Sequence, residues 1–177
     1  MRKFLFALAA TAAFVGSAAQ AQTATYAVDP SHTFATLEIS HFGASVNRAG
    51  FDKKEGTVQL DKTAKTGKVE LTLQIDSVNS GVAPFNKHLQ SAEIFDAEKF
   101  PTAKFVGDKF TFDGDKVVSV SGDLTIKGKT QPVTFKANQF ACYDNPMLKR
   151  EVCGGDFETT IDRTAFGVDY GVAYGFP

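Results

Sequence analysis

The sequence predicts an all-β protein with one short helix, in which antiparallel strands curl into a barrel. Apolar and polar residues alternate with a period of two along most of the chain, which is typical of half-buried strands. Turn signals separate these stretches and helical segments do not, so neighbouring strands should pair as an antiparallel meander. Such a sheet buries its edges best by closing into a barrel.

Residues 1–21 have the features of a bacterial secretory signal peptide. Arg2 and Lys3 precede a short apolar stretch, and a small-x-small motif of the kind that signal peptidases recognise ends at Ala21. The apolar stretch is shorter than the roughly 20 residues that a membrane-spanning helix needs. We therefore expect cleavage after Ala21, one domain over residues 22–177, no transmembrane segment, and export to the periplasm.

The charge of the chain argues against one class of partner. The sequence has 19 basic and 20 acidic residues, and removal of residues 1–21 would take two basic residues and no acidic one, leaving a net charge of −3. A chain without a basic stretch offers no electrostatic surface for nucleic acid. Its 17 phenylalanines suit either a dense core or the lining of a lipid-sized cavity, because phenylalanine is large and has no polar group.

The first alternating segment, residues 31–42, contains one histidine near each end. One face of the expected strand carries Ala35, Leu37 and Ile39. His41 shares that face because its position has the same parity, whereas His32 falls on the other face. This strand alone should therefore not bring the two histidines together. His41 is a structural histidine bonded to a buried carbonyl or carboxylate, a contact for the head group of a ligand, or a metal ligand.

Further strands follow the same pattern. Alternation is clearest over residues 68–76, 122–128, 133–137 and 155–163. Glycine-containing pairs that favour turns lie at residues 113–114, 127–128 and 154–155. The exception is the segment 84–101, whose apolar spacing fits a short amphipathic helix that begins at Pro84 and ends before Pro101.

Arg163 lies at the end of the last alternating stretch. Its position continues the apolar face of Phe157, Thr159 and Ile161. An arginine directed at a core is costly unless it meets an anion, a carboxylate or water. Because His41 and Arg163 each end an apolar face, both could lie at the mouth of one cavity and hold the polar end of an amphiphile. A structural salt bridge to an inner aspartate is the alternative for Arg163.

The two cysteines, Cys142 and Cys153, are expected to form a disulfide. An exported protein meets an oxidising compartment, where such a pair closes one loop. The spacing is not that of a redox-active CxxC motif, and two cysteines without nearby histidines make a poor zinc site. We therefore expect a structural cross-link and no metal.

Motifs of common enzymes are absent from the sequence. It lacks a GxSxG elbow, an HExxH helix, a P-loop and a dinucleotide-binding fingerprint. Ser31, His32 and Asp29 could be drawn as a catalytic triad, but the side chains of such close neighbours are expected to diverge. Three scattered histidines are a small ligand supply for a metal or haem. We expect no enzymatic activity and no cofactor; a periplasmic enzyme, or a haem- or metal-linked accessory of electron transport, is the alternative.

The sequence resembles the YceI family of bacterial polyisoprenoid-binding proteins over about residues 25–175. The marks of the resemblance are Asp29-Pro30-Ser31-His32-Thr33, Asn86-Lys87-His88-Leu89-Gln90-Ser91, Phe95-Asp96, Phe100-Pro101-Thr102-Ala103-Lys104-Phe105, the segment 122–128, and Arg163-Thr164-Ala165-Phe166-Gly167. No one of these motifs is decisive, but their ordered set is specific.

The resemblance implies an extended, lipocalin-like antiparallel barrel with a helix beside it. It also implies a long cavity for a polyisoprenoid, an isoprenoid quinone or a similar amphiphilic lipid, held for storage, transport or stress response. Some members form dimers, so the resemblance allows a homodimer without requiring one. The residues expected to contact the head group are Asp29, His32, His41 and Arg163. Those expected to line the tail pocket are Leu37, Ile39, Phe42, Leu73, Phe85, Leu89, Phe95, Phe105, Ile161 and Phe166.

The end of the sequence departs from the family pattern. Members continue past the region that resembles residues 163–167 into another alternating strand, which closes the barrel. Residues 168–176 here show little alternation, and the sequence stops at Pro177. Either the sequence is truncated or the expected barrel lacks its closing C-terminal strand.

Overall fold

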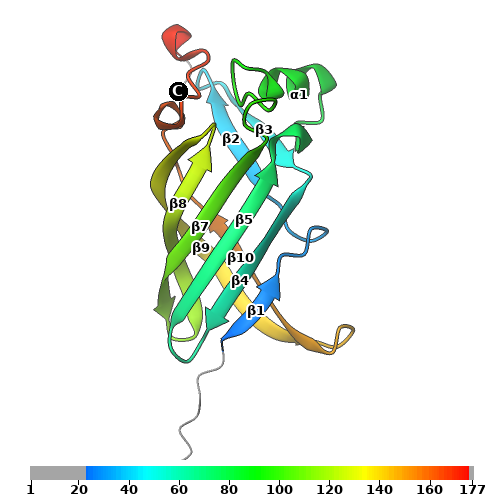
Figure 1. Ribbon diagram of the computed structural model, residues 1–177, viewed down its shortest axis with the longest axis vertical. Coiled ribbons are helices and arrows are strands. Elements are labelled where there is room, and N and C mark those ends of the chain that lie inside the picture. Colours follow the sequence, from blue (N-terminus) through cyan, green and yellow to red (C-terminus); the bar gives the residue numbers. More distant parts are fainter. Residues whose placement is uncertain (1–22, 176–177) are drawn as a thin grey trace, which may run out of the picture.

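The computed structural model describes residues 23–175 (Figure 1). The predicted signal peptide, residues 1–21, lies outside the described residues. The strands are β1 (Ala24–Ala27), β2 (Thr36–His41), β3 (Ser45–Phe51), β4 (Lys54–Asp61), β5 (Thr66–Gln74), β6 (Val78–Asn79), β7 (Thr102–Asp113), β8 (Lys116–Ile126), β9 (Lys129–Asn145) and β10 (Arg150–Glu158). The helices are α1 (Ala83–Gln90) and the short 3-10 helices η1 (Ile75–Ser77), η2 (Arg163–Phe166) and η3 (Val172–Tyr174).

Seven strands form one curled antiparallel sheet in the order β1-β4-β5-β7-β8-β9-β10 (Figure 1). The strands β2, β3 and β6 form a second, smaller sheet, which lies with α1 at the upper end of the curl in Figure 1. The predicted all-β class and the antiparallel pairing are confirmed, and so is the one α-helix among residues 23–175. The curl is a half-barrel, because β1 and β10 stand at opposite ends of the strand order.

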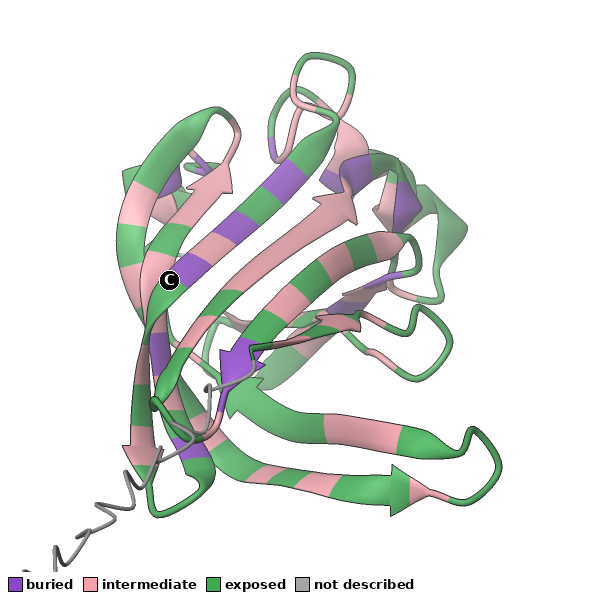
Figure 2. Ribbon diagram, turned by 60° about the horizontal axis from the view of Figure 1, so that its bottom comes forward, coloured by how far each residue is buried: buried purple, intermediate pink, exposed green. Residues whose placement is uncertain are grey.

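The core consists of two apolar clusters. The upper cluster has as its buried members Ala49, Phe51, Ile75, Val78, Leu89, Ile94, Ala103, Phe166 and Val168. The lower cluster has as its buried members Leu60, Phe105, Val117 and Val120. Leu124 and Val133 pack against both clusters, so apolar packing continues along the curl. The alternation of buried or intermediate residues with exposed ones along the strands is visible in Figure 2.

Two of the three predicted glycine turns are confirmed. Gly114, with φ of 57°, lies in the turn between β7 and β8. Lys127 and Gly128 join β8 to β9 with φ of 51° and 72°, the left-handed pair that a two-residue hairpin turn requires.

The turn predicted at Gly154 and Gly155 is wrong, because both residues lie inside β10. A register shift between Asp156 and Phe157 follows directly. A Cβ atom on Gly155 would lie 2.6 Å from the carbonyl oxygen of Gln139 on β9. Glycine here permits the close approach of two strands beside a bulge, which is its other common use in sheets.

The helix predicted over residues 84–101 is shorter than expected. It ends at Gln90, where the Ser91 hydroxyl and backbone N–H both donate to the His88 carbonyl oxygen, at 2.7 and 3.1 Å. Turns follow, and they place Ile94 and Phe95 against the upper cluster. The apolar spacing therefore predicted correctly that these residues are buried or half-buried. The helix nevertheless ends at Gln90, because Ser91 donates hydrogen bonds to a carbonyl oxygen of its last turn.

The strand predicted over residues 155–163 also ends early, at Glu158. The Asp162 carboxylate accepts hydrogen bonds from the backbone N–H and the hydroxyl of Thr164, at 2.9 and 2.7 Å, and so caps η2. Arg163 is thus the first residue of a 3-10 helix, and the expectation that it continues a strand face is wrong. After Glu158, the described residues form η2 and η3 and no strand.

Candidate functional site

The concave side of the large sheet carries a surface of aromatic rings around the lower cluster. Its half-buried members are Tyr26, Phe110, Phe112, Phe135 and Phe140, which we call the aromatic surface. Phe135 meets the buried Phe105 edge to face, with ring centroids 4.9 Å apart. These rings come from three strands, β1, β7 and β9, and each remains partly accessible to solvent. The arrangement offers an apolar wall that a hydrocarbon chain could cover.

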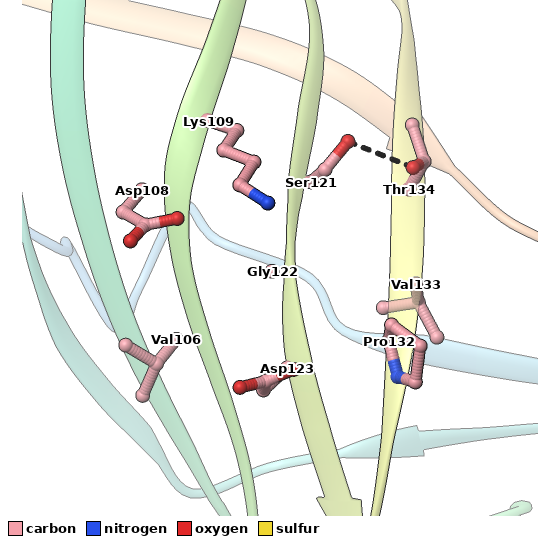
Figure 3. A pocket seen from close by; sticks show the side chains of 9 residues that line it. All are labelled: Val106, Asp108, Lys109, Ser121, Gly122, Asp123, Pro132, Val133 and Thr134. Carbon is pink, nitrogen blue, oxygen red and sulfur yellow. Dashed lines mark hydrogen bonds between the residues drawn. The ribbon is translucent and has the colours of Figure 1, made fainter.

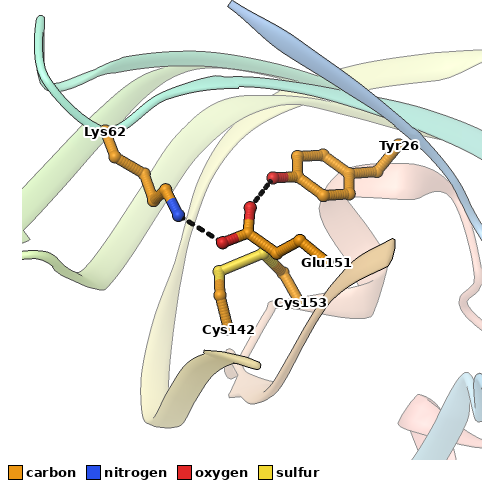
Figure 4. The surroundings of a disulfide bond; sticks show 5 residues. All are labelled: Tyr26, Lys62, Cys142, Glu151 and Cys153. Carbon is orange, nitrogen blue, oxygen red and sulfur yellow. Dashed lines mark hydrogen bonds and ion pairs between the residues drawn. A yellow bond between two sulfur atoms is a disulfide. The ribbon is translucent and has the colours of Figure 1, made fainter. Parts of the chain in front are cut away.

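A polar bridge links the two outer parts of the curl near this surface (Figure 4). Glu151 on β10 accepts a hydrogen bond from the hydroxyl of Tyr26 on β1 at 2.5 Å. Its other carboxylate oxygen lies 2.5 Å from Nζ of Lys62, just after β4. These three residues, the polar bridge, join β10 to β1 and β4 through side chains.

The polar bridge shifts the ionisation of two of its members. Hydrogen bonds from Lys62 and then Tyr26 hold the pKa of Glu151 below its ordinary value, against the effect of burial. Burial, followed by the hydrogen bond to Glu151, raises the pKa of Tyr26 to about 12. The contribution of Tyr26 to the stability of the folded state is therefore fully present below pH 10 and is lost as pH rises towards 12. Near neutral pH, the bridge joins an ionised carboxylate to a neutral phenol.

Replacing Glu151 by glutamine should lower the free energy of unfolding by about 1 kcal/mol near neutral pH, since two hydrogen bonds lose their charge at a partly exposed site. The pKa of Glu151 is lower in the folded protein than its ordinary value of 4.5. The stabilisation by the ionised carboxylate is therefore present above pH 4.5 and is lost as pH falls through the pKa of the folded state. The difference between the two proteins should therefore shrink in acid. Urea unfolding of both from about pH 7 to about pH 3 measures it.

A Glu98→Gln variant, which changes an exposed carboxyl outside the bridge, is the matched control. It should differ from the unaltered protein by less than about 0.5 kcal/mol at every pH. If the Glu151→Gln difference stays constant down to the lowest pH, the charge of Glu151 does not stabilise the fold.

The outer face of the sheet has two shallow hollows. One, of about 360 Å³, is lined by Val106, Asp108, Lys109, Ser121, Gly122, Asp123, Pro132, Val133 and Thr134 (Figure 3). The hydroxyls of Ser121 and Thr134 are 2.8 Å apart there. The other, of about 300 Å³, is lined by Glu55, Gly56, Thr57, Glu70 and Thr72. Both are mainly polar and contain none of the residues expected to contact a lipid, so neither suits an apolar tail.

Asp29 and His32, two of the expected head-group contacts, bind each other in the exposed loop between β1 and β2. His32 Nδ1 lies 2.7 Å from one carboxylate oxygen of Asp29, and the Ser31 hydroxyl donates to the other at 2.6 Å. The Ser31 hydroxyl, then His32, then the Ser31 backbone N–H hold the pKa of Asp29 well below its usual range.

The expectation that Asp29, Ser31 and His32 diverge is therefore wrong, but their contacts are not those of a hydrolase. In a catalytic triad, the serine and the carboxylate bind different nitrogens of the imidazole ring. Here Ser31 Oγ, at 3.1 Å, and Asp29 Oδ2 both lie at Nδ1 of His32, and the serine also donates directly to the aspartate. A proton cannot pass through the ring between groups bound to one nitrogen, so the contacts stabilise a turn.

His41 and Arg163, the other expected head-group contacts, lie at the end of β2 and at the start of η2. Both segments are at the upper end of the curl in Figure 1. His41 is exposed and meets Phe42 edge to face at 5.2 Å. Arg163 Nη1 donates to the carbonyl oxygens of Val168 and Tyr170, at 2.6 and 2.9 Å. These bonds tie the segment after η2 to that helix.

The residues expected to line a tail pocket are divided between the clusters. Buried in or packed against the upper cluster are Leu37, Leu73, Phe85, Leu89, Phe95, Ile161 and Phe166, while Phe105 belongs to the lower cluster. Ile39 is half-buried on β2, and Phe42 is 55% exposed in the turn that follows. Sequence reasoning missed four phenylalanines of the aromatic surface, although the alternation in KFTFD, residues 109–113, signals two of them.

Cys142 and Cys153 form the predicted disulfide, which is confirmed. They lie directly opposite each other on β9 and β10. Within residues 23–175, the side chains of Cys142, Glu151 and Cys153 form the one group of three that could offer ligands to a metal. Their sulfurs are joined to each other, and a disulfide sulfur is not the thiolate that a metal prefers.

In the part of the chain that the structure describes, no helix combines the length and apolar character that crossing a bilayer requires.

Known proteins resemble this chain over most of its length. A family model described as YceI-like domain matches residues 26–176. A UPF0312 protein of Pseudomonas putida is 36% identical over 171 residues, which is 95% of this chain and 88% of that protein. A UPF0312 protein of Pseudomonas fluorescens is 35% identical over the same length.

Solved structures share the fold. Burkholderia cenocepacia BcnA superposes with a TM-score of 0.65 at 24% identity, over 84% of this chain and 89% of its own. The Campylobacter jejuni YCEI protein gives a TM-score of 0.62 at 25% identity, over 80% of this chain and 83% of its own. The overall fold is therefore one that these proteins have in common with this chain.

Proposed function

The chain belongs to the YceI family, and on that premise we propose that it binds a polyisoprenoid or a similar long amphiphilic lipid, such as an isoprenoid quinone. The aromatic surface is the observation that carries the proposal. Five partly accessible rings on one concave face leave aromatic area open to an apolar ligand. Covering such area contributes about 25 cal/mol per Å², which favours a long apolar tail.

The proposed activity is binding, without covalent chemistry. The contacts of Ser31, His32 and Asp29 do not support a proton relay, and the half-buried residues packed around the lower cluster are aromatic and aliphatic. The half-buried carboxylate of Glu151 beside them is bonded to Lys62 and Tyr26. The signal-like sequence of residues 1–21 supports a periplasmic location, where an amphiphile would need a protein to shield its tail. Storage, transport and stress response are all roles that such binding could serve.

The tail contacts can be tested with purified protein. We expect mass spectrometry of its organic extract to find an amphiphile, and the lipid-free protein to take up added isoprenoid quinone. Phe140→Gln should weaken uptake about tenfold, because it places an amide on the aromatic surface. Phe34→Gln is the control, because that ring is 83% exposed in the loop before β2. An empty extract together with no uptake would rule the proposal out.

We keep His41 and Arg163 as the proposed head-group contacts, because both lie at the same end of the curl and both can donate hydrogen bonds. Arg163→Ala should weaken binding of a quinone by about tenfold and binding of a plain hydrocarbon by less than about twofold. Fluorescence titration with the two ligands compares the losses. Equal losses would mean that Arg163 acts through structural contacts, such as its bonds to Val168 and Tyr170, and not through the head group.

A further inference from the structure

The tip of the β9–β10 hairpin exposes a compact set of apolar side chains. Tyr143, Met147 and Leu148 are 54%, 89% and 53% exposed, and they lie in the last turn of the hairpin or beside it. The hairpin extends away from the rest of the large sheet, and its tip lies towards the opposite end of the long axis from α1 (Figure 1). This tip, residues 143–150, takes no part in the aromatic surface.

The tip is ordered by its own hydrogen bonds. The Asn145 side-chain oxygen accepts from the backbone N–H groups of Met147 and Leu148, at 2.9 and 3.0 Å. The Asn145 carbonyl oxygen accepts from the backbone N–H of Lys149 at 2.8 Å. The Cys142–Cys153 disulfide joins the two strands just below. The apolar surface is therefore already formed before a partner binds, so little conformational entropy would be lost in ordering it.

The charges around the tip are mainly positive. Lys149 and Arg150 are exposed beside the apolar residues, and Asp144 is the one exposed acid within the tip. The next acid, Glu151, is already paired with Lys62. Apolar and tyrosine side chains flanked by cations match the boundary between the head groups and acyl chains of an anionic bilayer.

We propose that this tip docks the protein onto the surface of a membrane rich in anionic phospholipid. Met147 and Leu148 enter the boundary region, Tyr143 lies at head-group level, and Lys149 and Arg150 contact lipid phosphates. Three apolar side chains at one turn offer far less area than the roughly 800 Å² per partner of a stable protein interface. A bilayer needs no such area, because a few inserted side chains and a few cations suffice for reversible binding.

Cosedimentation with lipid vesicles tests the docking surface. The unaltered protein should bind phosphatidylcholine vesicles that contain about one third phosphatidylglycerol, and should bind pure phosphatidylcholine at least roughly tenfold more weakly. Replacing both Met147 and Leu148 by aspartate should weaken binding to the anionic vesicles at least roughly tenfold. Lys149→Gln combined with Arg150→Gln should weaken it by roughly twentyfold.

Val82→Asp is the matched control, because Val82 is an exposed apolar residue beside α1, away from the tip. It should bind the vesicles like the unaltered protein. If the Met147, Leu148 double variant sediments with anionic vesicles as much as the unaltered protein does, the proposal is overturned. Equal binding of the unaltered protein to neutral and anionic vesicles would also overturn it. A monomer–dimer equilibrium that the double variant abolishes, without vesicle binding, would identify the tip as a contact between copies of the chain. Quinone uptake, measured separately, stays unchanged if only the docking proposal fails.

Discussion

Replacing Phe166 by alanine should lower the free energy of unfolding by about 3–5 kcal/mol, the largest effect expected from a single substitution in this chain. Phe166 is 2% exposed and is among the largest fully buried side chains of the described residues. It ends η2 and packs in the upper cluster, beneath α1 and the small sheet. Truncation removes apolar contacts and leaves a cavity where three different elements meet, so the neighbours can collapse only in part.

Urea unfolding followed by circular dichroism measures this loss, and thermal unfolding should show a midpoint about 6–20 °C lower. Phe34→Ala is the matched control, because the same side chain is removed where it is 83% exposed, and it should cost less than about 0.5 kcal/mol. A loss below about 1 kcal/mol for Phe166→Ala would show that the segment after β10 is not packed into the upper cluster.

The sheet could be predicted because one physical cause, burial of alternate residues, leaves a direct trace in the sequence. Val69, Leu71 and Leu73 on β5 illustrate this, since each contacts one of the two clusters. The turn at Lys127 and Gly128 could be predicted because it needs positive φ at both residues. Gly154 and Gly155 could not, because the same residue type also serves close approach between strands, and composition alone does not separate the two uses.

Arg163 shows where period-two reasoning ends. Its parity extends the pattern of β10, but Asp162 and Thr164 form a local hydrogen-bonded cap that turns the backbone into η2. An aspartate two residues before a threonine was the available signal for such a cap. The parity of a residue number predicts the face of a side chain only while the backbone remains extended. The direction of the Arg163 side chain could therefore be determined only from the structure.

The candidate site was predictable in kind rather than in detail. The abundance of phenylalanine indicated an apolar wall, and the alternation in residues 109–113 could have supplied Phe110 and Phe112. The polar bridge could not be predicted, because Tyr26 and Glu151 are 125 positions apart and meet only through the curl of the sheet. No short-range pattern records the curvature that brings the first and last strands together.

Breaking the Cys142–Cys153 bond should lower the free energy of unfolding by about 3 kcal/mol and the thermal midpoint by about 6–12 °C. The two cysteines are separated by 11 positions, so the bond closes a loop of roughly a dozen residues in the unfolded chain and restricts its entropy. The bond also lies in a part of the hairpin where β9 pairs with β10 alone, because the pairing of β9 with β8 ends at Lys136.

Thermal unfolding with and without a dithiol reductant measures the effect, and the double variant Cys142→Ser, Cys153→Ser is the control. The variant should unfold near the temperature of the reduced protein and should not respond to the reductant. Hydrogen exchange should quicken at the amides of Tyr143 and Val152, which are paired just beyond the bond, while β5 and β7 stay protected. Tyr26, Phe110 and Phe112 of the aromatic surface lie on β1 and β7, which the bond does not join, and Phe135 lies where β9 is still paired with β8. The lipid that is bound should therefore remain the same. A change in ligand identity on reduction would therefore mean that the hairpin itself shapes the binding surface.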